Sequence, residues 1–136
     1  MDLERFVTAQ DSGGTYQRAV AELRDGRKTS HWMWFIFPQI AGLGHSAMAQ
    51  AYAIGNLAEA QAYLAHPVLG PRLVECAEIL ASHRGLSAEQ IFGGIDAIKL
   101  RSSMTLFARA DPDQAIFRQV IDQYFAGPDP ETDRRI

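Results

Sequence analysis

Apolar side chains recur along most of this chain at the spacing of an amphipathic helix. The first such stripe has the i, i+3, i+4, i+7 pattern that brings residues to one helix face. It consists of Tyr16, Ala19, Val20 and Leu23. Gly26 follows, and a glycine in the left-handed conformation is a common helix end. The pattern therefore predicts a helix that ends at about residue 26.

The middle of the chain contains signals for two more helices. Asn56, with Glu59 three residues later, resembles an N-cap pairing. The stripe that follows contains Leu57, Ala60, Gln61 and Leu64 and ends at His66-Pro67. A longer helix is expected next, with a stop near Gly85 and a buried face that contains Leu73, Cys76 and Leu80. Pro71 is compatible with that helix only in its first turn.

The C-terminal part carries further start and stop signals. Ser87 to Gln90 has the pattern of a capping box, and Gly93-Gly94 breaks the short helix after it. A helix from about Ile95 to Phe107 is then expected. Asp111-Pro112 is typical of a helix start, with Asp111 as N-cap and Pro112 at the first helical position. The buried face of that last helix contains Ile116, Phe117, Val120, Ile121 and Tyr124, and Gly127-Pro128 closes it.

No alternating strand pairs separate these segments, so the sequence predicts an all-α fold. We expect residues 1–136 to form a single compact domain of short amphipathic helices, since no repeat or linker divides the chain. The polar tail, residues 128–136, is expected either to be a flexible terminus or to fold over the surface.

Residues 28–46 depart from the helical pattern and contain both tryptophans and two of the four histidines. The run Trp32 to Phe37 is apolar on every side, which allows either a buried strand or a short buried helix. In an otherwise helical chain we favour a buried helical turn, which Ser30 is able to cap and Pro38 to end. Its aromatic side chains are expected in the core; they are Trp32, Trp34, Phe35 and Phe37.

Polar residues that bracket this apolar run are candidates to line a ligand pocket. They are His31, Gln39, His45 and Ser46, and for each of them a surface or core role is the alternative. Gly42-Leu43-Gly44 permits unusual backbone angles and leaves amides free to meet a ligand. The segment lacks the preceding strand and third glycine of a dinucleotide-binding loop.

A second polar cluster lies on the helix expected from Ile95. At about 100° per residue, its apolar face contains Leu100, Ser103, Met104 and Phe107. One interpretation is an Asp96–Lys99 ion pair at the edge of that face. The other is that Asp96, Lys99 and Ser103 form one wall of a polar pocket, because a charge turned towards a core must be paired or used.

The composition excludes several classes of protein. The 136 residues are 47% hydrophobic and 21% charged, as in a folded domain. The formal charge of -3 argues against nucleic-acid binding, which requires a basic surface. No apolar run is long enough to span a bilayer, so no membrane association is predicted. The N-terminus lacks a signal-peptide pattern, so we expect a cytoplasmic location.

The cysteine and the histidines give no metal or redox site. Cys76 is the only cysteine, so no internal disulfide forms, and its place in an apolar stripe predicts a small buried thiol. His31 and His45 lack a third ligand at metal spacing, and His66 and His83 stand alone. No metal or cofactor is therefore predicted, and the oligomeric state is open.

The run His31-Trp32-Met33-Trp34-Phe35-Ile36-Phe37-Pro38-Gln39 closely resembles a bacterial family catalogued as a domain of unknown function, DUF1810. The resemblance continues through residues 42–44, 66–70, 91–93, 96–100 and 102–107, and so covers nearly the whole chain. It implies a multihelical, all-α fold and no established activity. The motifs coincide with the two unusual segments, which favours their meeting in space.

The first functional hypothesis is a binding or regulatory module. Residues 28–46 and 96–103 would form an aromatic-walled pocket for a small polar or anionic ligand, such as a nucleotide. Trp34 would stack on the ligand and Gln39 would bind a polar edge. A phosphate would meet Lys28, Lys99 or Arg101, and the candidate lining is completed by His45, Ser46 and Ser103.

Two alternatives stay open. In the first, the protein is a hydrolase or glycosidase that acts on a nucleotide or ADP-ribose derivative. Asp96 would activate water or stabilise positive charge, and His31 or His45 would assist. The spacing specifies no acid/base pair, so this alternative ranks second. In the other, both segments serve the core and a surface patch binds another protein.

Overall fold

The computed structural model describes residues 2–136. These residues contain ten α-helices and one 3₁₀ turn. Within residues 2–136, Ile40 and Ile54 form an isolated parallel β-bridge. The all-α fold expected from the sequence is therefore confirmed.

Two helices at the N-terminus form a corner. α1 (Glu4–Asp11) and α2 (Thr15–Asp25) are joined by the 3₁₀ turn Ser12–Gly14, in which two glycines have positive φ. The end predicted for α2 is confirmed, because Gly26 has φ 73° and its N–H binds the carbonyls of Glu22 and Leu23. α1 was not predicted from the apolar pattern.

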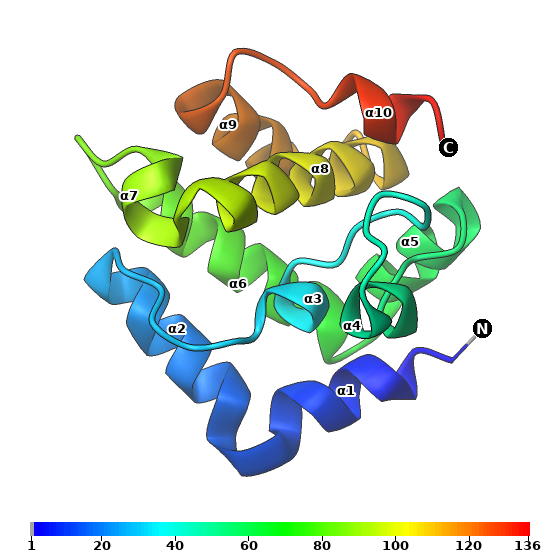
Figure 1. Ribbon diagram of the computed structural model, residues 1–136. Coiled ribbons are helices and arrows are strands. Elements are labelled where there is room, and N and C mark those ends of the chain that lie inside the picture. Colours follow the sequence, from blue (N-terminus) through cyan, green and yellow to red (C-terminus); the bar gives the residue numbers. More distant parts are fainter. Residues whose placement is uncertain (1) are drawn as a thin grey trace.

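α8 (Gly94–Ala110) crosses the middle of the molecule (Figure 1). It packs against α5 (Leu57–Ala65), α7 (Ala88–Phe92), α9 (Ala115–Tyr124) and α10 (Pro130–Asp133). Residues 102–108 of α8 are all buried, whichever face they occupy. This stretch is enclosed on all sides, so it has no single apolar stripe, and its sequence mixes small, polar and apolar residues.

α6 (Leu69–Ser82) supplies the second long element and contacts α2, α5 and α9. Pro71 lies in its first turn, as predicted. Cys76 is fully buried in this helix, and burial raises the pKa of its thiol to about 12. The predicted small buried thiol is confirmed, and it is inert as a nucleophile at neutral pH.

Side-chain caps start several helices where the sequence predicts them. Asn56 accepts a hydrogen bond from the Glu59 N–H at 2.8 Å at the start of α5. Ser87 and Gln90 form the reciprocal capping box of α7. Gly93, with φ 80°, then separates α7 from α8.

The start predicted at Asp111-Pro112 is wrong. α8 continues to Ala110, and Asp111 is its C-cap, whose N–H binds the Phe107 carbonyl. The Asp111 carboxylate accepts from the Asp113 N–H at 3.2 Å, which stabilises a turn. α9 begins three residues later than predicted, at Ala115. An aspartate that bonds a nearby backbone N–H serves turns as well as helix starts.

The unusual segment forms the predicted helical turn, α3 (Met33–Ile36). Ser30 does not cap it: Trp32 is the N-cap residue without a side-chain bond, and the Ser30 hydroxyl donates to Glu22. The predicted core position is confirmed for Trp32, Phe35 and Phe37, whereas Trp34 is only partly buried. The chain then continues into α4 (Ala47–Ala51), and the Ile40–Ile54 bridge ties this region together.

The tail also has structure, since α10 packs against α8. The aromatic core continues beneath, where the rings of Phe6, Tyr63, Phe107 and Phe117 succeed one another at centroid distances of 5.2–5.9 Å. Among residues 2–136, no helix combines the length and hydrophobicity needed to cross a membrane.

Candidate functional site

The two unusual segments meet at Asp96, in the first turn of α8. The Lys28 Nζ lies 2.9 Å from Oδ2 of Asp96, and the Lys28 backbone N–H donates to the Ile91 carbonyl at 2.7 Å. The Lys99 Nζ approaches the other carboxylate oxygen, Oδ1, at 3.4 Å. The Asp96–Lys99 ion pair that the spacing suggested is therefore present, together with a second partner that spacing did not suggest.

Both lysines of the sequence take part in this arrangement, and each also lies over a tryptophan. The Lys28 ammonium is 5.0 Å from the Trp32 ring centroid, and that of Lys99 is 5.3 Å from the Trp34 ring. One carboxylate between two ammonium groups leaves the cluster with a net positive charge. The aromatic faces favour cations at these distances and help to hold both lysines in place.

Glu22, on α2, holds the backbone that carries Lys28. Its Oε1 accepts from the N–H groups of Thr29 and Ser30 and from the Trp32 indole, and its Oε2 accepts from the Ser30 hydroxyl. Burial alone would raise the pKa of the Glu22 carboxyl, but these hydrogen bonds outweigh burial and lower the pKa to about 2. Glu22 therefore stays ionised and positions residues 28–32.

Sequence reasoning did not identify Glu22. A signal existed, because a carboxylate in the last turn of a helix faces the negative end of the helix dipole. Such a residue requires compensating donors, and here the following loop supplies them.

An open groove of about 280 Å³ lies beside the lysine cluster. The loop after α3 forms one wall, α8 forms the floor, and the tail forms the other wall. Its lining residues are Gln39, Leu43, Gly44, Ile95, Ile98, Lys99, Ser102, Asp129 and Glu131. Ile95 and Ile98 are 75% and 67% exposed. Adjacent large apolar residues left this open commonly mark a binding surface.

Gln39 lies where two hollows meet. It also lines a second depression of about 260 Å³ on the α4 side of the loop. Its backbone carbonyl accepts from the Ile54 N–H at 2.8 Å, which fixes its position. Within residues 2–136 no hydrogen bond engages its side-chain amide, so a ligand is able to use both the amide donor and the carbonyl acceptor.

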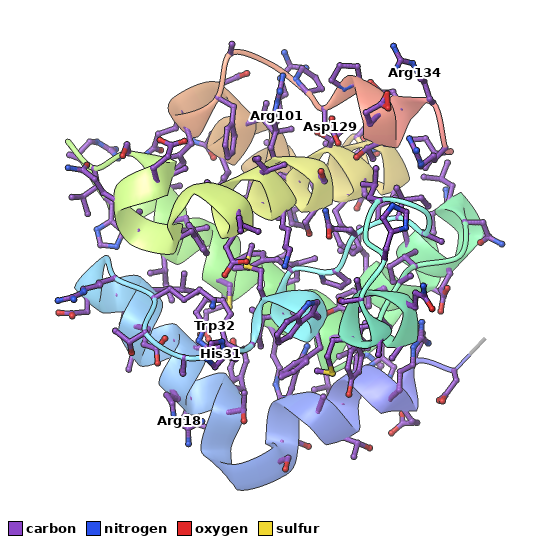
Figure 2. The ribbon with its side chains drawn as sticks, in the orientation of Figure 1. Arg18, His31, Trp32, Arg101, Asp129 and Arg134 are labelled. Carbon is purple, nitrogen blue, oxygen red and sulfur yellow. The ribbon has the colours of Figure 1, made fainter. Side chains whose placement is uncertain are left out.

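The tail wall is held by a polar network on α8. The Arg101 guanidinium donates to the carbonyls of Gly127 and Pro128 at 2.8 and 3.0 Å. Asp129 accepts from the Ser102 hydroxyl at 2.7 Å, and its N–H donates to Thr105 Oγ1 at 2.9 Å. Arg101 and Asp129 lie on the α10 side of α8 (Figure 2). The guanidinium proposed for a phosphate is thus engaged in fixing the chain's own tail.

The remaining candidates are dispersed. Ser46 caps α4 by accepting from the Ala49 N–H, and His45 is exposed on the loop before it. Ser103 is fully buried, and its hydroxyl has no hydrogen-bond partner in residues 2–136. Figure 2 places His31 beside α2, well away from Arg101 and Asp129, and His31 is exposed.

The positions of these residues do not support the catalytic hypothesis. Asp96 is paired on both sides by lysines, and no hydrogen bond joins it to a histidine within residues 2–136. The hydrolase alternative stays a prediction. In the same part of the chain, no cluster of three or more potential ligands is arranged for a metal ion.

Five residues of the groove were not among the candidates: Ile95, Ile98, Ser102, Asp129 and Glu131. The sequence could have indicated the two isoleucines, because neither belongs to the apolar face predicted for the helix that starts at Ile95. The tail carboxylates gave no such signal, since nothing in their spacing indicates that they lie on α8.

The structure is that of a small helical protein with an open surface groove beside a lysine cluster. The chain belongs to the DUF1810 family, described as a protein of unknown function, whose model matches residues 1–136. It is similar to the conserved hypothetical protein Rv1873 from Mycobacterium tuberculosis, a crystal structure with 51% sequence identity and a TM-score of 0.94. That match covers 98% of this chain and 94% of the other. No curated protein matches.

Proposed function

We propose that this protein binds a small molecule in the groove that lies between α8 and the loop that follows α3. The ligand combines an apolar face with an anionic group, as a nucleotide does. The observation that carries this proposal is the pair of exposed isoleucines, Ile95 and Ile98, directly beside the ammonium of Lys99.

The isoleucines supply the driving force. Covering one isoleucine side chain fully is worth about 1.5–3 kcal/mol, and both are largely uncovered in the free protein. The groove volume of about 280 Å³ lies near the lower end of small-molecule sites. A flat ring system is the shape that covers two neighbouring aliphatic side chains in so shallow a space.

Lys99 supplies the charge. Its ammonium has one carboxylate partner, Asp96, at 3.4 Å, and that carboxylate is already bonded more closely to Lys28 at 2.9 Å. Lys99 therefore has N–H donors available for an anion, and Asp96 remains paired when Lys99 turns to a ligand. The unbonded amide of Gln39 provides a further polar contact across the groove.

Calorimetric titration with AMP, with inorganic phosphate in parallel, tests the proposal. AMP should bind the wild-type protein, and Lys99→Met should weaken binding about tenfold or more, because it keeps the side-chain stem and removes the charge. Gln39→Ala should weaken it less. Arg18→Met is the matched control, since it removes one positive charge from α2, far from the groove (Figure 2).

The possible results of this titration either support or overturn the proposal. Binding that is lost in Lys99→Met and kept in Arg18→Met supports the groove as the site. Absence of AMP binding to the wild type, or equal binding by both lysine and arginine variants, overturns the proposal.

A further inference from the structure

The groove is electrically asymmetric. Lys99 stands on its α8 side, while Asp129 and Glu131 stand on the tail side. We infer that the ligand carries an amine or similar hydrogen-bond donor opposite its anion, and that Glu131 accepts from it. This inference rests on the proposed function, and it adds the polarity and orientation of the ligand.

Asp129 is not free to accept from a ligand. Its Oδ2 already accepts from the hydroxyls of Ser102 and Thr132, both at 2.7 Å. Its Oδ1 accepts from the Glu131 N–H at 3.2 Å. These bonds use the carboxylate to cap α10 and to attach it to α8, so Asp129 is part of the wall.

The Glu131 carboxylate is able to accept a further hydrogen bond. Its carboxylate is paired with Arg134 through Oε2, and Oε1 has Arg135 at 3.7 Å, beyond hydrogen-bond distance. The side chain is 47% exposed and lines the groove. An ionised carboxylate accepts several hydrogen bonds, so Glu131 retains acceptor sites for a donor in the groove.

An ionised carboxylate has no hydrogen to donate, so the open acceptor sites of Glu131 favour a donor over an anion or a bare carbonyl. A ligand with its anion at Lys99 therefore lies with its donor end at Glu131, and the isoleucines lie beneath the ring between these ends. A nucleoside monophosphate whose base bears an amino group satisfies all three contacts. A sugar phosphate satisfies only the contact at Lys99.

The test compares two probes that differ only in that amino group: AMP and purine riboside 5′-monophosphate. In calorimetric titrations, the wild-type protein should bind AMP about tenfold more tightly or better, because the bond from the amine to a carboxylate is charge-assisted. Glu131→Met, which removes both acceptor oxygens and keeps the length of the side chain, should remove most of this preference, while phosphate-dependent binding of both probes is retained.

Asp133→Asn is the matched control. Asp133 is on the same helix and pairs with Arg109 at 2.9 Å, and it does not line the groove. The preference for AMP should survive this substitution. Its loss in Asp133→Asn would mean that the effect comes from looser attachment of α10, which overturns a direct role for Glu131.

Three other results would overturn this inference. Equal binding of both probes to the wild type overturns this inference and leaves the proposed function standing. A preference that persists in Glu131→Met overturns the role of Glu131 as the acceptor. If neither probe binds, the proposed function fails and this inference fails with it.

Discussion

At the scale of single residues, the Glu22 carboxylate links α2 to the lysine cluster. It receives four hydrogen bonds from residues 29–32, and Lys28 directly precedes that run. The Lys28 Nζ also donates to the Ser30 carbonyl at 2.6 Å. The position of the Lys28 ammonium against Asp96 thus depends on a residue that touches neither Asp96 nor the groove.

Glu22→Gln should lower the free energy of unfolding at pH 7 by about 1–2 kcal/mol, less than the full pKa shift implies because the carboxylate is partly solvated. The lowered pKa adds stability above the unfolded value of 4.5, and that stability is lost as the pH falls towards about 2. Urea denaturation of wild type and variant should therefore give curves that converge between pH 4.5 and 2. A difference that is the same at every pH would contradict this account.

Only part of the site was predictable from residue spacing. Asp96 and Lys99 lie three residues apart on one helix, so their contact follows from helix geometry. The closer partner, Lys28, belongs to a distant loop, and its contact depends on how α2, α7 and α8 pack. Periodicity contains no information about such long-range pairs.

At the scale of elements, α5 and α6 pack tightly against each other at Gly70. A Cβ atom there would lie 2.1 Å from the Leu64 carbonyl oxygen, at the corner between α5 and α6. That contact is with backbone, so neither partner can move aside without shifting a helix. The corner permits both helices to reach the core, where Tyr63 and Leu69 are fully buried.

Gly70→Ala should therefore destabilise the protein by about 1–3 kcal/mol or more, through displacement of α6 from α5. Gly94→Ala is the control, since a Cβ at this first residue of α8 meets nothing within 4 Å. It should be neutral or stabilising by up to about 1 kcal/mol. Chemical denaturation measures both, and equal midpoints for the two variants would be inconsistent with a tight corner.

Predictions of elements succeeded where one local interaction decides the structure. Gly26, the Asn56 cap and the Ser87–Gln90 capping box each depend on residues within one turn. The start at Asp111 failed because the same carboxylate bond also stabilises a turn. α1 was missed because no side chain caps it, whereas α10 was missed although Asp129 and Pro130 form the same start signal that was read at Asp111-Pro112.

At the scale of the whole molecule, three separate segments build the groove, and the C-terminal one completes it. Asp129 connects that segment to α8 through the Ser102 hydroxyl and the Thr105 hydroxyl. The wall of the groove therefore depends on tertiary contacts made by the last residues of the chain. The sequence left open whether that tail folds, because its polar composition suits both a frayed end and a docked one.

Asp129→Ala should detach this wall. The substitution removes the cap of α10 and leaves the Ser102 and Thr132 hydroxyls without that acceptor, which should cost about 1–3 kcal/mol. Hydrogen exchange should accelerate at the amides of residues 130–135. Asp133→Asn, which breaks a surface ion pair with Arg109, should cost less than about 1 kcal/mol. Unchanged exchange in Asp129→Ala would show that other contacts hold the tail.

The two tryptophans lie on the same short segment, and this gives the protein an internal optical reporter. Trp32 is enclosed and its indole N–H is bound to Glu22, whereas Trp34 is partly open and lies under the Lys99 ammonium. Tryptophan fluorescence therefore arises entirely from the segment beside the groove. Emission from Trp34 should respond to any event that moves Lys99, while emission from Trp32 should change only when the loop held by Glu22 opens, so Trp34→Phe and Trp32→Phe separate the two signals.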